Sequence, residues 1–429
     1  SISKIELEGG SNSAYRMNVD GLPGDYFENL EIAPDDSLWV FIEVTIDPST
    51  QNLPFVIEDR ILFETNGNNQ VVQLAAWGQN AYFHGGLGVL SVLDCPTAVW
   101  NPDKPHVIYG IVAVDEGCTL TINAGTQVYC HKGGGLYVYK GVLEVNGQLN
   151  NEVVFQGDRL EAEFAHTPGQ WGIEIPFEFE SVFGVEEVTI SRGGIWLFQT
   201  EGCVIDYAII KNGNIGVQVD TVGNVNADAL MIRNTKIQNM AAIGLLAQSA
   251  NISGFNDLFG NSGQHSLALT LGGRYAFDHC TVANYWSDGN RQTPSFVLNN
   301  FYEDIDGNLQ VRQLTEGTAF RNCIFWGNNA NLSDFNEFAV VLEQEESQIY
   351  FFNDCALDTD LDVSDGPHYL NIRNGLTPPF EAAADGDFHL NTTSNAWQAQ
   401  SIGFPDLDLD GVSRSSNFPP EKGCYEFAD

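Results

Sequence analysis

Apolar and polar side chains alternate along the first 94 residues, as they do in β-strands with one buried face. Apolar residues recur at every second position from 38 to 46. Two further apolar runs, 61–64 and 71–75, flank Asn66-Gly67-Asn68-Asn69, which is a typical hairpin turn. We therefore predict that residues 1–94 form a small antiparallel β-sandwich.

The pattern changes at Cys95 to short apolar runs separated by Gly or Asn. The runs are too short for helices and contain many β-branched residues, which favours strands. The first of them occupy residues 107–114, 120–122, 128–130, 136–139, 142–145 and 153–155.

A four-residue pattern repeats along this second region: an aromatic or aliphatic residue, two polar residues, then a small or apolar one. Its six copies end at Ala208, Thr235, Leu258, Cys280, Cys323 and Cys355, with spacings of 27, 23, 22, 43 and 32 residues. Spacings of 22 to 27 residues suit one coil of three short strands, stacked about 4.8 Å from the next coil. We predict an all-β protein, with a three-faced, right-handed parallel β-helix over residues 95–404. The sandwich at 1–94 would cap its N-terminal end.

The 43-residue spacing indicates one coil plus an excursion. The excursion is predicted at 286–317, where runs 296–301 and 309–314 would form a β-hairpin that leaves the solenoid. Excursions of this kind often build binding surfaces. Residues 405–429 are predicted to close the C-terminal end.

The predicted β-helix, on its residues 95–213, resembles the pectin-lyase-like β-helix proteins that occur as surface lipoproteins of Bacteroidota. The residues that carry this resemblance are Asp94-Cys95, Trp100, Pro105, Val107–Gly110, Gly117–Ile122, Gly125-Thr126, Phe155–Glu161, Pro168–Trp171 and Ala208–Gly213. The resemblance implies a β-helix fold and a cell-surface location. That group is largely of unknown function, so the resemblance implies no activity.

The chain is strongly acidic, with 57 acidic against 18 basic residues and a formal charge of −39. Nucleic acid is therefore excluded as a partner, since phosphate binding needs clustered Lys and Arg. Polyanionic sugars are disfavoured, whereas calcium is favoured; the alternative is that the surface acid only keeps an extracellular protein soluble. No apolar run reaches the 18 residues of a membrane span. We expect a secreted protein, or one on the extracellular face of the outer membrane and attached only through an N-terminal lipid anchor.

Two features suggest a disulfide and a cation site. Cys95 and Cys118 lie 23 residues apart, one coil, so stacked positions would bring them within disulfide range; two free buried thiols are the alternative. Asp406, Asp408 and Asp410 precede Gly411 in the pattern that begins a calcium loop. The loop is incomplete because its twelfth position holds Asn417, so a solvated acidic turn is the alternative.

Candidate chemistry is otherwise sparse. Trp171, Trp196, Trp286 and Trp326 are candidates for stacking on carbohydrate, with core packing as the alternative. Asp158, Arg159, Glu161 and His166 are candidates for an acid/base group, with an ordering ion pair as the alternative. The Gly-His-Gly and Arg-Ile-Lys elements of β-helix glycoside hydrolases are absent from the sequence.

Three functions remain open. The first is a non-catalytic surface scaffold or binding protein that joins protein partners in a surface complex, with a glycan as a further ligand. The second is a polysaccharide lyase or glycoside hydrolase, which the fold alone suggests. The third is a calcium-dependent adhesin.

Overall fold

The computed structural model describes residues 1–45, 55–78, 80–94, 96–181, 184–220, 227–303, 307–328, 336–391, 397–399, 405–414 and 419–427. The chain forms two compact units, Ser1–Tyr82 and Phe83–Asp429. The division falls before residue 94 because strand β8 (Tyr82–Val92) pairs with the first strands of the solenoid.

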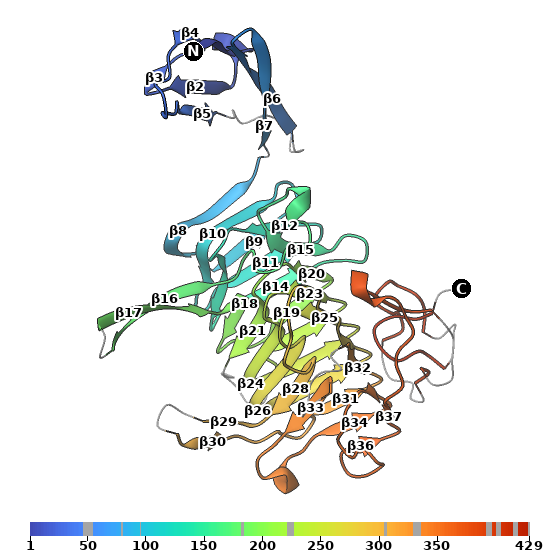
Figure 1. Ribbon diagram of the computed structural model, residues 1–429. Helices are drawn as coiled ribbons and strands as arrows, with labels where there is room; N and C mark the ends of the chain where they lie inside the picture. Colours follow the sequence, from blue (N-terminus) through green and yellow to red (C-terminus); the bar gives the residue numbers. More distant parts are fainter. Residues whose placement is uncertain are drawn as a thin grey trace. The chain divides into compact units, whose positions relative to one another are not determined.

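The first unit is a β-sandwich of two antiparallel sheets (Figure 1). One sheet has the order β4-β1-β6-β7, with β4 (Tyr26–Leu30), β1 (Ile2–Leu7), β6 (Phe55–Thr65) and β7 (Asn68–Gly78); the other has the order β3-β2-β5, with β3 (Leu22–Pro23), β2 (Tyr15–Val19) and β5 (Val40–Val44). A 3₁₀ turn, η1 (Gly10–Asn12), joins β1 to β2. Alternate residues of both sheets fill the core, including Ile5, Met17 and Ile61.

The predicted hairpin of this unit is confirmed. Thr65 pairs with Asn68 across the two-residue turn Asn66-Gly67, and both turn residues have positive φ, 51° and 76°. Such turns match the twist of the flanking strands, which explains the preference for Asn-Gly.

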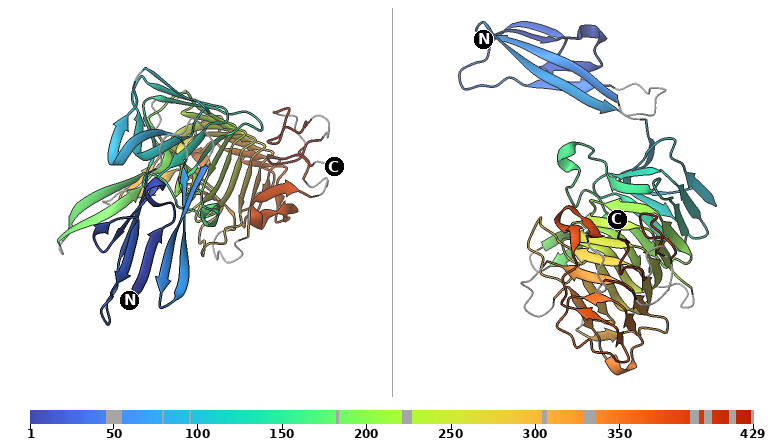
Figure 2. Two further views of the ribbon diagram at one scale, coloured as in Figure 1. Left: turned by 90° about the horizontal axis from the view of Figure 1, so that it is seen from above. Right: turned by 90° about the vertical axis from the view of Figure 1, so that its right-hand side faces the viewer.

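The second unit is a right-handed parallel β-helix with three sheets, which we name I, II and III (Figures 1 and 2). Sheet I contains the second half of β10 (His106–Val114), β13 (Gly135–Tyr139), β18 (Gly193–Phe198), β21 (Ile215–Asp220), the first halves of β24 (Ile243–Phe255) and β26 (Leu267–Asp278), β28 (Phe296–Asn299) and β33 (Phe338–Val341).

Sheet II contains β9 (Thr97–Trp100), β11 (Thr119–Asn123), β14 (Val142–Asn146), β19 (Cys203–Asp206), β22 (Leu230–Arg233), the second halves of β24 and β26, β31 (Ala319–Arg321), β34 (Phe351–Asn353) and β36 (Tyr369–Leu370). Sheet III contains the first half of β10, β12 (Gln127–Cys130), β15 (Val153–Gly157), β20 (Ala208–Lys211), β23 (Lys236–Met240), β25 (Leu258–Ser262), β27 (Thr281–Asn284), β32 (Ile324–Gly327), β35 (Ala356–Leu357) and β37 (Arg373–Asn374).

Each coil passes through sheets I, II and III in turn, so equivalent side chains stack on one another. Inward positions are aliphatic near the start of the solenoid and aromatic near its end. The rings of Phe277, Phe320 and Phe352 stack in one inward column, with centroids 5.8 and 4.5 Å apart. This continuous apolar interior is what makes the scaffold rigid.

The predicted column of small residues is correct except at one coil. Lys236 pairs with Leu258, so the residue stacked on Thr235 is Asp257, and Asp257 in turn lies in register with Cys280. Leu258 points outward instead. Asp257 is fully buried, its Oδ1 accepts the Thr235 N–H at 3.1 Å, and burial raises its pKa well above the usual range.

The excursion at 286–317 is shorter than predicted. Phe296–Asn299 is β28, a strand of sheet I, because the side chains of Phe296 and Leu298 point inward and pack in the core of the solenoid. Only β29 (Phe301–Glu303) and β30 (Leu309–Val311) form the hairpin. A second hairpin, β16 (Glu174–Ser181) with β17 (Gly184–Ser191), leaves between sheets III and I and was not predicted. In Figure 1 both hairpins project on the side opposite the C-terminal segment.

The remaining elements are β38 (Phe380–Ala382) and β39 (Asp387–Leu390), which pair antiparallel, and the 3₁₀ turns η2 (Ala162–Phe164), η3 (Glu345–Ser347) and η4 (Ala383–Asp385). The described residues contain no α-helix. The C-terminal segment packs on the outer face of sheet III through Phe388, Leu409, Cys424 and Tyr425, which cover Leu258 and Ala283.

Candidate functional site

Four aromatic side chains gather on the outer face of sheet I. Tyr137 and Tyr139 come from β13, Trp196 and Phe198 from β18, and the register pairs Tyr137 with Trp196 and Tyr139 with Phe198. The intervening Leu136, Val138, Ile195 and Leu197 point inward, so strand alternation forces the rings outward. We call these four residues the aromatic platform.

The rings of the platform are held close together and are half-exposed. The Tyr137 and Trp196 centroids lie 4.6 Å apart, and the Tyr139 and Phe198 rings lie 6.0 Å apart and nearly parallel, at 19°. The parallel register of two rigid strands fixes these spacings, so little side-chain freedom remains to be lost on binding a ligand.

A cavity of about 200 Å³ opens beside the platform. Tyr137 and Trp196 form one wall, together with Ile111 of β10, Leu90 of β8, and Ile173 and Ile175 at the base of the β16–β17 hairpin. The hairpin that the sequence did not predict therefore contributes part of the wall of this cavity.

Polar groups border the platform. Trp196 Nε1 donates to Asp220 Oδ2 at 2.7 Å, and Gln218 Nε2 donates to the same oxygen at 2.8 Å. Burial raises the pKa of Asp220, although both hydrogen bonds and nearby Arg192 oppose the shift. The Arg192 guanidinium lies 5.5 Å from the centroid of the Trp196 ring.

This arrangement can contact a sugar. Aromatic rings accept the C–H face of a pyranose, and the Arg192 guanidinium at the border can bind its hydroxyls, whereas Gln218 and Asp220 are buried. Glycoside hydrolysis needs two carboxylates about 5–10 Å apart across the scissile bond. Burial and the neighbouring Tyr139 raise the pKa of Tyr137, and the nearby carboxylates Asp115 and Asp220 raise it further, so two carboxylates lie near the platform.

The four predicted tryptophans lie in different surroundings. Only Trp196 belongs to the platform. Trp171 is buried against Gly194 and Gly213, and its Nε1 donates to the Lys211 carbonyl at 2.8 Å, so its ring has no face free for a sugar. Trp326 is buried under the C-terminal segment. Trp286 is half-buried beside Gly263 on the turn after sheet III.

The structure describes only one of the two cysteines of the predicted disulfide. Cys118 is disulfide-bonded, whereas Cys95 lies outside the described residues. The other six cysteines of the chain are free and buried. Their burial raises the pKa of each thiol, which makes them unreactive core residues.

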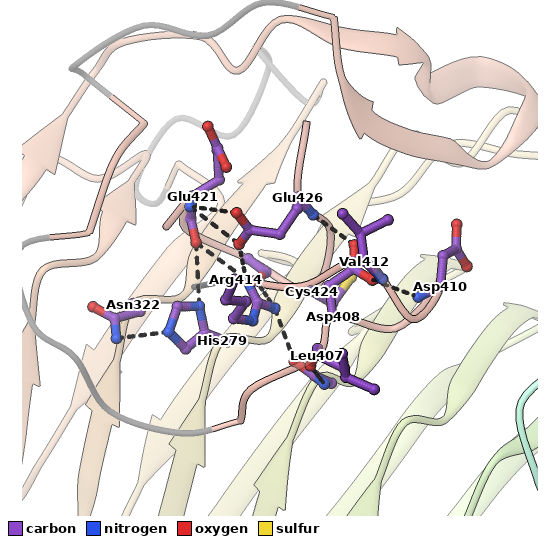
Figure 3. A network of polar contacts seen from close by, with 12 residues as sticks. His279, Asn322, Leu407, Asp408, Asp410, Val412, Arg414, Glu421, Cys424 and Glu426 are labelled. Carbon is purple, nitrogen blue, oxygen red and sulfur yellow. Dashed lines mark hydrogen bonds and ion pairs between the residues drawn. The ribbon is translucent and has the colours of Figure 1, made fainter. Parts of the chain in front are cut away.

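Two of the three carboxylates of the predicted calcium loop, Asp408 and Asp410, have different partners (Figure 3). Asp408 is buried and accepts the backbone N–H groups of Asp410, Val412 and Glu426 at 2.9, 2.7 and 2.7 Å. Asp410 instead bonds His389 Nε2 at 2.8 Å. Within the part of the chain that the structure describes, no three His, Cys, Asp or Glu side chains are grouped to hold a metal ion.

The segment around these residues clasps the solenoid. Asn234, Asn256, His279 and Asn322 occupy one left-handed corner of successive coils, with φ of 49° to 55°. The segment hydrogen-bonds this corner through Leu407, Arg414, Glu421 and Gly423 (Figure 3). We call residues 405–414 and 419–427 the clasp.

The residues of the candidate acid/base group also have different partners. Arg159 pairs with Glu161 at 2.9 Å on the surface, as expected of an ordering ion pair. Asp158 instead bonds His131 Nδ1 at 2.7 Å, across adjacent coils. His166 contributes only its backbone carbonyl to Asn239.

The sequence contained a signal for the platform that the search for single tryptophans missed. Leu136-Tyr137-Val138-Tyr139 and Ile195-Trp196-Leu197-Phe198 share one pattern, in which aliphatic and aromatic residues alternate. In a β-helix this pattern places two aromatic rings outward on each strand.

Comparison with known proteins adds little to the geometry. No family model and no curated protein matches the chain. Among solved structures, the catalytic unit of a thermostable GH87 α-1,3-glucanase from Streptomyces thermodiastaticus strain HF3-3 is similar, with 11% identity and a TM-score of 0.23. The match covers 87% of this chain and 64% of that one. No helix among the described residues is long and apolar enough to cross a membrane.

Proposed function

We propose that this protein is a non-catalytic binding protein of the cell surface, and that its β-helix presents the aromatic platform to a carbohydrate. The observation that carries the proposal is the pair of in-register strands that hold Tyr137, Tyr139, Trp196 and Phe198 on one outer face beside a cavity. The four rings point outward and are partly exposed, so a ligand with an apolar face can cover them on binding.

The charge of the chain restricts which sugars can be the ligand. A net charge of −39 repels polyanionic sugars, so the ligand is an uncharged glycan. The resemblance to Bacteroidota surface lipoproteins supports a location on the extracellular face of the outer membrane, through a lipid anchor. In that setting the rigid scaffold would join protein partners in a surface complex and supply glycan binding to it.

The proposal is tested by binding measurements on the full chain with a panel of uncharged polysaccharides: laminarin, xylan, galactomannan and dextran. We expect the wild-type protein to bind at least one of them. Trp196→Ala should weaken that binding at least tenfold, whereas Trp196→Phe, which keeps a ring, should weaken it less. Tyr302→Ala is the matched control, because Tyr302 is an exposed aromatic residue on the β29–β30 hairpin.

Two outcomes would overturn the proposal. Binding to none of the polysaccharides, or equal binding by wild type and Trp196→Ala, would remove the platform as a glycan site. Release of shortened oligosaccharides during the incubation would favour the lyase or hydrolase alternative, with Asp220 as the first carboxylate to substitute.

A further inference from the structure

The first unit carries its own exposed aromatic residues, separate from the platform. Trp39 and Phe41 are 66% and 63% exposed, and their rings lie 6.4 Å apart at an angle of only 22°. Leu38 and Val40, which alternate with them, pack against the sandwich core. We call Trp39 and Phe41 the N-terminal pair.

The backbone under the N-terminal pair is fixed by the sheet. Phe41 lies in β5 opposite Asn18 of β2, and the Trp39 carbonyl accepts the Asp20 N–H at 2.9 Å. Phe41 therefore projects from β5, and Trp39 projects from the residue just before that strand, where its carbonyl is hydrogen-bonded. Their near-parallel arrangement is built into the fold before any ligand arrives, which lowers the entropy cost of binding.

A row of polar side chains runs beside the two rings. Arg16, Asn18 and Asp20 follow one another along β2 and the turn after it, and Arg16 lies opposite Glu43 of β5. Arg16 and Asp20 are exposed, whereas Asn18 Oδ1 is buried. A ligand on this face thus meets two aromatic rings and, next to them, a carboxylate and a guanidinium group whose Nη1 already donates to the Tyr15 carbonyl.

The size and chemistry of the face select the occupant. A stable protein interface buries about 800 Å² on each partner, far more than two rings provide. A sugar chain needs little more than these two rings, because one pyranose face stacks on each ring while its hydroxyls bind the polar row. The acidity of the chain again selects an uncharged glycan.

We propose that the N-terminal pair is a second carbohydrate-binding site, which takes an uncharged polysaccharide through stacking on Trp39 and Phe41 and hydrogen bonds to the exposed side chains of Arg16 and Asp20. The site stands on its own geometry and does not depend on the platform of the second unit.

The test uses the full chain, with the same four polysaccharides as probes. Trp39→Ala/Phe41→Ala is made in the wild-type background and in the Trp196→Ala background. The matched control is Val71→Ala/Val72→Ala, which removes exposed apolar side chains from β7 in the other sheet of the same unit. Because both rings are exposed, far-UV circular dichroism and melting temperature should stay unchanged in the pair variant.

We expect the pair variant to weaken retention of at least one polysaccharide at least tenfold in the Trp196→Ala background, and the control variant to leave retention unchanged. Unchanged retention in the pair variant would overturn the second site, even if Trp196→Ala alone loses binding. A pair variant that changes only the sedimentation coefficient would assign these rings to self-association and would also overturn it. Loss in the pair variant alone would keep the second site and remove the platform.

Discussion

The clasp depends on one buried arginine. Arg414 donates through Nη1 to the Glu426 carboxylate and the Glu421 carbonyl, and through Nη2 to Asn256 Oδ1 at 2.8 Å and the Gly423 carbonyl at 3.1 Å (Figure 3). The side chains of Arg414 and Glu426 are only 4% and 0% exposed. Arg414→Met keeps most of the apolar stem and removes every one of these donors.

The expected loss follows from what the substitution leaves behind. Removing one partner of a buried ion pair costs about 3–5 kcal/mol, since the other charge stays buried. Burial and Glu421 already raise the pKa of Glu426 to about 8, while Arg414 opposes the shift. With a pKa of about 8, Glu426 already holds a proton in most wild-type molecules at pH 7, so the ion pair is only partly charged there and the loss at pH 7 should lie near the lower limit. A raised carboxyl pKa means that stability is lost as the pH rises through that pKa, so the loss should grow at pH 9.

Hydrogen exchange measures this local stability directly. Exchange of the Asp410, Val412 and Glu426 amides, all bonded to Asp408, should accelerate roughly a hundredfold or more, since each 1.4 kcal/mol is a factor of about ten. Arg321→Met is the control, because its ion pair with Asp278 is 3.5 Å long and the arginine is 45% exposed, so it should cost less than about 1 kcal/mol. Equal exchange rates in Arg414→Met and wild type would refute the reasoning.

Three further predictions concern the two ends of the solenoid and the sandwich. Burial lowers the pKa of His84 to about 4, and the neighbouring His106 acts in the same direction, so the stability that neutral His84 contributes is present above pH 6.5 and is lost as the pH falls towards 4. The melting temperature of the wild type should therefore fall more steeply between pH 6.5 and 4 than that of His84→Gln. Parallel curves of melting temperature against pH would contradict this. Because backbone N–H groups occupy Asp408, EDTA should leave the melting temperature unchanged while Asp408→Asn lowers it, and a calcium-dependent rise would instead support the adhesin alternative. Gly67→Ala should destabilise the sandwich by about 1–2 kcal/mol in urea titration, because φ at Gly67 is +76°, which strains any residue with a Cβ. An added Cβ would meet no atom within 4 Å, so backbone strain is the expected cause of the loss. An unchanged urea midpoint would count against a strained turn.

The fold could be predicted because its signals are local and repeated. Alternation, an Asn-Gly turn and coil-length spacings each follow from backbone geometry that recurs along the chain. The error at Leu258 has a physical cause: a buried aspartate, Asp257, occupies the column there, and no hydrophobic pattern expects a carboxylate in an apolar interior. Phe296 was assigned to the hairpin because an excursion and a short strand of the solenoid carry the same alternation.

The candidate site was harder to predict because it depends on which strands become neighbours. Trp196 and Tyr137 are 59 positions apart in the sequence, and the unpredicted β16–β17 hairpin lies between them. Buried and half-exposed tryptophans look alike in the sequence, so Trp171 and Trp326 were grouped with Trp196. The carboxylates Asp406, Asp408 and Asp410 match a cation motif, yet their orientation depends on partners as distant as His389 and Glu426.

Glycan binding by the platform is the central claim, and isothermal titration with and without Trp196→Ala tests it most directly. The titrant is the polysaccharide of the panel that binds wild type best, and the Tyr302→Ala and Trp39→Ala/Phe41→Ala variants are titrated in parallel. In the Trp39→Ala/Phe41→Ala background, where the platform is the one proposed site that remains, the account predicts at least a tenfold rise in Kd when Trp196→Ala is added and no change when Tyr302→Ala is added. The same Kd with and without Trp196→Ala in that background would contradict it.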